Sequence, residues 1–128
     1  MGPRIHQRVI AQLISGLSPL YHNAVIKLEP LPETMLDEGR ISQVPDVSLY
    51  NNETDQTPIV IEICHTNGMK DDVLKVIELI DADRYGIREG FIYNYKTQQW
   101  LRYRFGDNGV TEALSYSEIL SLDLNQFL

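Results

Sequence analysis

The chain has 128 residues, enough for one domain with a substantial core and too few for two, so we treat residues 1–128 as a single domain. Its hydrophobic content of 43% and charged content of 23% are ordinary globular values and argue against intrinsic disorder. The net charge of −7 argues against the broadly basic surface with which some proteins coat nucleic acids, although a local basic strip remains compatible with it.

The cysteine content and the hydropathy pattern bear on the compartment. The single cysteine, Cys64, cannot form an internal disulfide, which fits a reducing cytoplasm. Residues 1–12 lack the apolar core of a signal peptide, and no apolar run approaches the ~20 residues that a membrane span needs. We therefore expect a cytoplasmic protein without a membrane partner.

The first third of the chain predicts a helix followed by a strand. Apolar residues at intervals of three and four predict a helix that begins near Pro3 and ends at Ser18-Pro19, with its inward face formed by Ile5, Val9, Leu13, Ile14 and Leu17. The segment Ala24–Glu29 then alternates like a strand, and Pro30 stops it. A short pair around Met35-Leu36 and residues 40–41 follows, with turn residues at 37–39.

Two further strands are predicted to form a hairpin. Val44–Tyr50 reads as a strand that carries Pro45-Asp46 at its start, and a polar turn separates it from Ile59–Cys64. The second of these runs has no alternation, which is typical of a central strand buried on both faces. We therefore expect the strands of Asp46 and Glu62 to be neighbours.

The second half of the chain predicts a helix and more strands. A helix is expected from about Asp71 to about Arg84, ended by Gly86, and strands are expected over Phe91–Tyr95 and Trp100–Phe105. A turn over 106–109 leads to a short expected strand at 110–114, and Ser115 with Glu118 resembles the capping box of a last helical turn. This order predicts an α/β protein of the α+β sandwich type, with a mixed central β-sheet flanked by helices.

Glu62 is the anomaly of the predicted central strand. Burying an ionised carboxylate costs several kcal/mol or more, roughly, unless a cation, hydrogen bonds or a metal compensates it. Asp46, on the neighbouring strand, would add a second negative charge, and each acid would raise the pKa of the other. This pairing suggests a metal ion, whereas the alternatives are an edge strand with Glu62 in water and an Asp46 satisfied by local amides.

Together these residues resemble a known family. Pro45-Asp46, then Ile59–Cys64 with Glu62, then a helix bearing Lys75, look like the PD-(D/E)XK restriction-endonuclease-like superfamily. The chain is most similar to a short bacterial branch whose active-site lysine has migrated from the strand to the following helix. The match extends over nearly the whole chain and includes His6 near the start, the glycine turn at 86–87, the aromatic strand Phe91–Tyr93 and the ending 117–128.

The resemblance implies a Mg²⁺-dependent endonuclease that hydrolyses phosphodiester bonds of DNA. Asp46 and Glu62, with the carbonyl of Ile63, would hold Mg²⁺ (Mn²⁺ as a substitute), and Glu29 or a residue of the first helix would be an added ligand. Lys75 would be the third catalytic residue, because Cys64 stands where the parent motif has lysine. Cutting a duplex by this fold usually needs two sites, which implies a homodimer.

A second group of residues is a candidate for nucleic-acid binding. Trp100, Arg102 and Arg104 share one face of their expected strand, a mixture that contacts phosphates and stacks bases. The alternatives for this face are a water-exposed outer strand surface or an oligomer contact.

Two other functions stay open on the sequence. Cys64 at the usual lysine position and the negative net charge also fit a catalytically inactive member of the same fold that serves as a nucleic-acid or protein binding module. The third possibility is an unrelated α+β protein in which Glu62 is a structural polar residue. The distance between Asp46 and Glu62, and the direction in which Lys75 points, discriminate among the three.

Overall fold

A computed structural model of the chain describes residues 3–37 and 43–128. Its secondary structure consists of two α-helices, α1 (Arg4–His22) and α2 (Met69–Asp81), a five-stranded sheet, a small two-stranded sheet and two 3-10 helices, η1 (Thr66–Gly68) and η2 (Leu124–Phe127). None of the helices in these two described ranges combines the length and apolar content that crossing a bilayer requires.

The main sheet is mixed, and its strands lie in chain order. Its members are β1 (Glu29–Pro32), β2 (Val47–Asn51), β3 (Gln56–Cys64), β4 (Glu89–Asn94) and β5 (Gln99–Arg104). Only the β3–β4 pairing among them is parallel, because the chain returns from the end of β3 through α2 before it enters β4. The prediction that the run with Glu62 is a central strand is confirmed.

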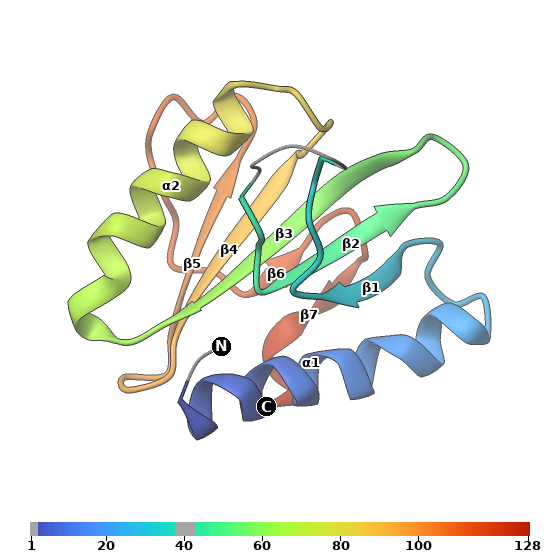
Figure 1. The fold of residues 1–128 in the computed structure, drawn as a ribbon, viewed down its shortest axis with the longest axis horizontal. Helices are drawn as coiled ribbons and strands as arrows, with labels where there is room; N and C mark the ends of the chain where they lie inside the picture. Colours follow the sequence, from blue (N-terminus) through green and yellow to red (C-terminus); the bar gives the residue numbers. More distant parts are fainter. Residues whose placement is uncertain (1–2, 38–42) are drawn as a thin grey trace.

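The helices cover opposite faces of this sheet, so β3 is buried on both sides (Figure 1). Ile59, Ile61 and Ile63 pack into a core beneath α1, while Val60 and Cys64 pack into a second core beneath α2. The alternation of a strand therefore turns Glu62 toward the face that α2 covers. The mixed sheet with flanking helices is the α+β architecture that the sequence predicts.

The predicted end of the first helix was wrong. Pro19 lies inside α1, which continues to His22, and the carbonyl of Pro19 accepts a hydrogen bond from Asn23 N at 2.9 Å. A proline inside a helix costs about 3 kcal/mol, but Leu20 and Tyr21 pack against the core and offset that cost. Tertiary packing thus overrides the local signal.

The first strand was also predicted in the wrong place. Residue 24 lies in a turn and residues 25–28 form bends rather than a strand, although Ile26 and Leu28 are buried, and β1 instead contains Pro30 and Pro32. An edge strand such as β1 uses hydrogen bonds to one neighbour only, so it tolerates prolines that would interrupt a central strand. Met35 and Leu36 lie outside any strand, and the rest of the expected pair at 40–41 lies outside the described residues.

The C-terminal segment differs from the prediction as well. The expected strand at 110–114 is reduced to one bridge between Glu112 and Arg102, because the amide of Leu114 donates back to the carbonyl of Glu112 and turns the chain away. Instead of a capped helix after Ser115, the chain forms β6 (Tyr116–Ser117), which pairs with β7 (Leu122–Asp123). Ser115 Oγ bonds Asp123 rather than the N3 amide of a helix.

Candidate active site

Asp46 and Glu62 lie side by side across the β2–β3 hairpin. Val47 pairs with Ile61, so the residue before β2 faces the residue after Ile61. The backbone amide of Ile63 donates a hydrogen bond of 2.7 Å to Oδ2 of Asp46. Asp46 is therefore tied to the strand that carries Glu62, and the predicted hairpin is confirmed.

Glu62 is a buried acid with a strongly shifted pKa. Its residue is 5% exposed, and burial, followed by the negative charge of Asp46, raises the pKa of its carboxyl to about 8. Lys75 works against this shift, because its ammonium favours the ionised form. The site thus contains an acid whose charge depends on the cations brought near it.

Lys75 reaches this acid from α2. Its Nζ lies 3.5 Å from Oε2 of Glu62, and its side chain is 32% exposed while that of Glu62 is 6% exposed. The position follows from helix packing, because Val76 and Ile80 are the buried residues of α2 and hold the helix on the sheet. Three sequence-predicted residues from three different elements therefore converge at one point.

Cys64 occupies the same strand face as Glu62, two residues later. It is buried, and desolvation raises the pKa of its thiol to about 12. A neutral thiol neither binds Mg²⁺ nor compensates Glu62. The only cationic side chain in the described part of the chain that contacts Glu62 is therefore Lys75.

Two further residues belong to the site: His6, which the sequence indicated only through the family resemblance, and Asp72, which it did not indicate for the site. Nε2 of His6, on α1, lies 3.2 Å from Oδ2 of Asp46, and Asp72 lies one turn before Lys75 on α2. Burial raises the pKa of Asp72, and the charge of Asp46 adds to the increase. The available signal for His6 was its position three and four residues before Val9 and Ile10, on the inward side of a helix.

Of the two proposed sources of an additional metal ligand, Glu29 and the first helix, only one lies near Asp46 in the described part of the chain. Glu29 pairs with Tyr50 at the far end of β2 and accepts a hydrogen bond from Asn52, so it does not reach Asp46. The first helix does reach Asp46, through His6.

The donor set fits a hard divalent cation that keeps most of its water. Two largely buried carboxylates meet here, and burial, followed by the charge of Asp46, raises the pKa of Glu62. Within residues 3–37 and 43–128, no group of three His, Cys, Asp or Glu side chains forms a complete metal cage. Mg²⁺ suits such a site, because proteins commonly hold it by one or two carboxylates, with water and substrate phosphate as the other ligands.

The structure does not support the predicted nucleic-acid face on β5. Trp100 is buried in the core beneath α1, where Nε1 donates to Asn125, and Arg102 is 4% exposed. Arg104 and Arg102 form ion pairs with carboxylates of this chain, which are Asp107, Glu112 and Glu118. Arginines that are already paired and a buried indole leave little surface for phosphates or bases.

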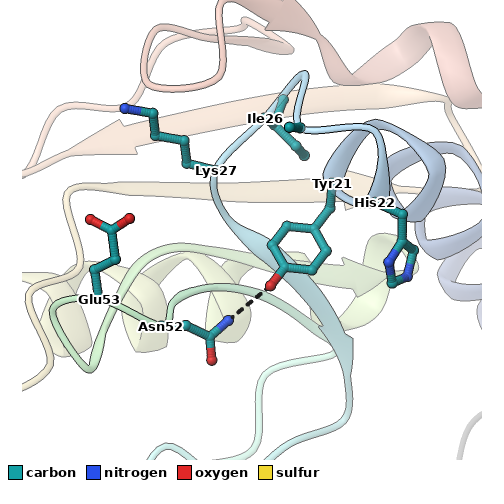
Figure 2. A pocket seen from close by; sticks show the side chains of 7 residues that line it. Tyr21, His22, Ile26, Lys27, Asn52 and Glu53 are labelled. Atoms are coloured by element: carbon teal, nitrogen blue, oxygen red, sulfur yellow. Dashed lines mark hydrogen bonds between the residues drawn. The ribbon is translucent and has the colours of Figure 1, made fainter.

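A separate hollow lies at the opposite end of the sheet. Its volume is about 470 Å³, and Tyr21 and Asn52, joined by a hydrogen bond of 3.1 Å, form part of its wall together with His22, Lys27 and Glu53 (Figure 2). These residues come from the end of α1, the segment before β1 and the β2–β3 turn, whereas Glu62 and Lys75 are near the other end of β3. The hollow does not belong to the acidic site.

Several solved structures resemble this fold, and two of them are described below. The first is described as a putative nuclease belonging to DUF820 from Anabaena variabilis; it matches with a TM-score of 0.71 and 19% identity, over 99% of this chain and 82% of that one. The second is the type IIG restriction endonuclease BpuSI, with a TM-score of 0.58 and 12% identity, over 80% of this chain and 12% of BpuSI.

No family model matches the sequence, and no curated protein matches it. At identities of 19% and 12% the structural likeness shows the fold alone, which is restriction-endonuclease-like. The fold is thus the one that the resemblance implies, and the activity is left to be argued from the site.

Proposed function

We propose that the protein is a Mg²⁺-dependent nuclease that hydrolyses phosphodiester bonds of DNA. The observation that carries the proposal is the convergence of Asp46, Glu62 and Lys75, from the bend just before β2, from β3 and from α2, at one point of a restriction-endonuclease-like fold. The names of the two structural neighbours, a putative nuclease and a restriction endonuclease, support the same reaction class.

The two acids have distinct parts in this proposal. Asp46 and Glu62 would hold Mg²⁺, which supplies charge neutralisation for the scissile phosphate and lowers the pKa of water. Glu62 approaches the ion from a desolvated strand, where its carboxylate attracts a cation more strongly than it would in water. Asp46 is oriented by the amide of Ile63.

Lys75 contributes the positive charge beside the two carboxylates. Its Nζ, at 3.5 Å from Glu62, favours the ionised form of that carboxyl against the effect of burial, and the lysine side chain is partly exposed. From that position the ammonium would orient the attacking water and stabilise the negative charge that develops on the phosphate oxygens. We extend the proposal to a homodimer, because cutting both strands of a duplex requires two such sites.

Calorimetric Mn²⁺ binding tests the proposal. We expect wild-type protein to bind Mn²⁺ and the Asp46→Asn, Glu62→Gln double variant to lose binding, since it lacks both anionic ligands. The Glu53→Gln, Glu78→Gln double variant removes the same charge from exposed positions and serves as the matched control. Absence of binding by folded wild-type protein would overturn the metal-dependent nuclease.

A catalytically inactive binding module is the second candidate. The observation that favours it is Cys64, a buried neutral thiol at the position where the parent motif has lysine. Mn²⁺ binding that depends on both acids, together with no cleavage of single- or double-stranded DNA or RNA, would support the module. Metal-dependent cleavage of any of these substrates would support the nuclease.

A further inference from the structure

Asp46 receives two contacts on the same oxygen. Ile63 N lies 2.7 Å from Oδ2, and Nε2 of His6 lies 3.2 Å from the same atom. Neither a hydrogen bond nor an ion pair from the described ranges 3–37 and 43–128 reaches Oδ1. The carboxylate therefore has one engaged oxygen and one oxygen left for a ligand.

His6 is itself held in place. Its Nδ1 contacts Oε1 of Gln7 at 2.9 Å, and Nε2 of Gln7 donates to Glu33 at 3.3 Å. The helix that carries the ring is fixed by Val9 and Ile10, which are buried against the sheet. The side chain of His6 is 14% exposed, so the ring lies mostly inside the structure.

Asp46 needs such a partner because its backbone contact does not orient its side chain: the carbonyl of Asp46 accepts a hydrogen bond of 3.0 Å from Glu33 N, which leaves the plane of the carboxylate unset. The residue lies just before β2, in a bend outside the strand. A single hydrogen bond from Ile63 would let the carboxylate turn about its Cβ–Cγ bond. A second contact, from Nε2 of His6 on another element, fixes the plane of the group.

We propose that His6 is a positioning residue that holds Asp46 through Oδ2 and thereby presents Oδ1 to the metal ion. The inference rests on the proposed function, since the ion is the one assigned to Asp46 and Glu62. It makes α1 part of the site: the helix aligns one carboxylate, and α2 supplies the lysine for the other. His6 does not itself touch the ion or the substrate in this arrangement.

The test compares two substitutions of His6 by Mn²⁺ calorimetry on folded protein. We expect His6→Leu to bind Mn²⁺ about 10–100-fold more weakly than wild type, the usual effect of removing a group that orients a metal ligand. His6→Gln should recover most of the affinity, because its carboxamide can donate to Oδ2 from nearly the same place. His22→Leu, the same change at the other end of α1, is the control and should bind like wild type.

The outcomes separate this inference from the proposed function. Failure of wild-type protein to bind Mn²⁺ would overturn both. Wild-type affinity, or tighter binding, in His6→Leu would overturn the positioning role alone, and so would equal losses in His6→Leu and His6→Gln. If His6→Leu does not fold, Gln7→Leu takes its place, since it frees the ring without changing it; a measurable loss of affinity supports the inference and unchanged affinity overturns it.

Discussion

Glu62 is the residue whose charge sets the behaviour of the site. In the folded protein its pKa is raised to about 8, whereas an unfolded chain has the ordinary value near 4.5. Between these two values the folded state binds a proton that the unfolded state has already lost. The contribution of Glu62 to stability is therefore fully present below about pH 4.5 and is lost as the pH rises through about 8.

This shift predicts a pH-dependent stability in metal-free protein. We expect the free energy of unfolding of wild type to fall between about pH 5 and 8 by as much as several kcal/mol, and the Glu62→Gln variant to lack most of that decline. Urea denaturation at a series of pH values in EDTA measures both. Glu53→Gln, an exposed acid, is the control and should follow wild type. Parallel curves for wild type and Glu62→Gln would contradict the raised pKa.

Lys75 gives a second prediction at the scale of one residue. We expect Lys75→Met to lower DNA cleavage by about 10²-fold or more, because it removes the group proposed to orient water and to stabilise the transition state. Mn²⁺ binding should survive, since both carboxylates remain. Lys70→Met, an exposed lysine of the same helix, is the control and should retain activity. Equal cleavage rates for the two variants would contradict a catalytic Lys75.

The placement of α2 on the sheet depends on a glycine of β4. A Cβ added at Gly90 would lie 2.4 Å from Cγ1 of Val76 and 2.8 Å from Cδ1 of Ile80, closer than carbon atoms approach one another. The helix therefore sits on β4 at a distance that only glycine permits. Since Val76 follows Lys75 directly, this close contact also sets where Lys75 lies relative to Glu62.

Gly90→Ala is expected to move α2 away from the sheet. Overpacking of this kind costs about 1–3 kcal/mol, which thermal unfolding would measure as a lower Tm. We also expect cleavage to fall more than stability alone explains, because Lys75 moves with the helix. Gly68→Ala adds the same methyl group at a position with nothing within 4 Å and should leave Tm nearly unchanged. A Gly90→Ala variant as stable as wild type would contradict the close packing.

At the scale of the whole molecule, the net charge of −7 predicts that the site repels DNA, the proposed substrate, until a cation is present. We expect the Asp46→Asn, Glu62→Gln double variant to bind DNA about tenfold more tightly than wild type in EDTA at about pH 9, where Glu62 of the wild type is ionised, since two like charges no longer face the phosphates. Fluorescence anisotropy measures the affinity. The Glu53→Gln, Glu78→Gln double variant has the same net charge, so an equal gain in that control would show a general charge effect instead.

Much of the sheet could be predicted from the sequence because its signals are local. The unbroken apolar run around Glu62 predicted a central strand, and the alternation over Trp100–Phe105 predicted a further strand of the sheet, although not that Trp100 is buried in the core. The convergence of Asp46, Glu62 and Lys75 followed from the expected hairpin and from the resemblance to a family. These features depend on the spacing of residues within short segments, and that spacing can be read from a single sequence.

The remaining features depend on contacts between distant segments. Arg102 and Arg104 look like a free basic strip until the later loop brings Glu112 and Glu118 to them. His6 is one polar residue among several on its helix, and only the docking of α1 shows that it reaches Asp46. The continuation of α1 through Pro19 likewise depends on core packing that local propensity does not contain.

The chain order of the sheet also bears on how the protein folds. The β1–β2, β2–β3 and β4–β5 pairings are antiparallel between consecutive strands, whereas the parallel β3–β4 pairing must wait for the chain to return through α2. Closing that longer loop costs more conformational entropy and is expected to come later in folding. The β2–β3 hairpin would then bring Asp46 and Glu62 together while both are still hydrated, before α2 docks and Lys75 arrives. Water would screen the repulsion of the two acids during the early stages, and their burial would coincide with the arrival of the lysine.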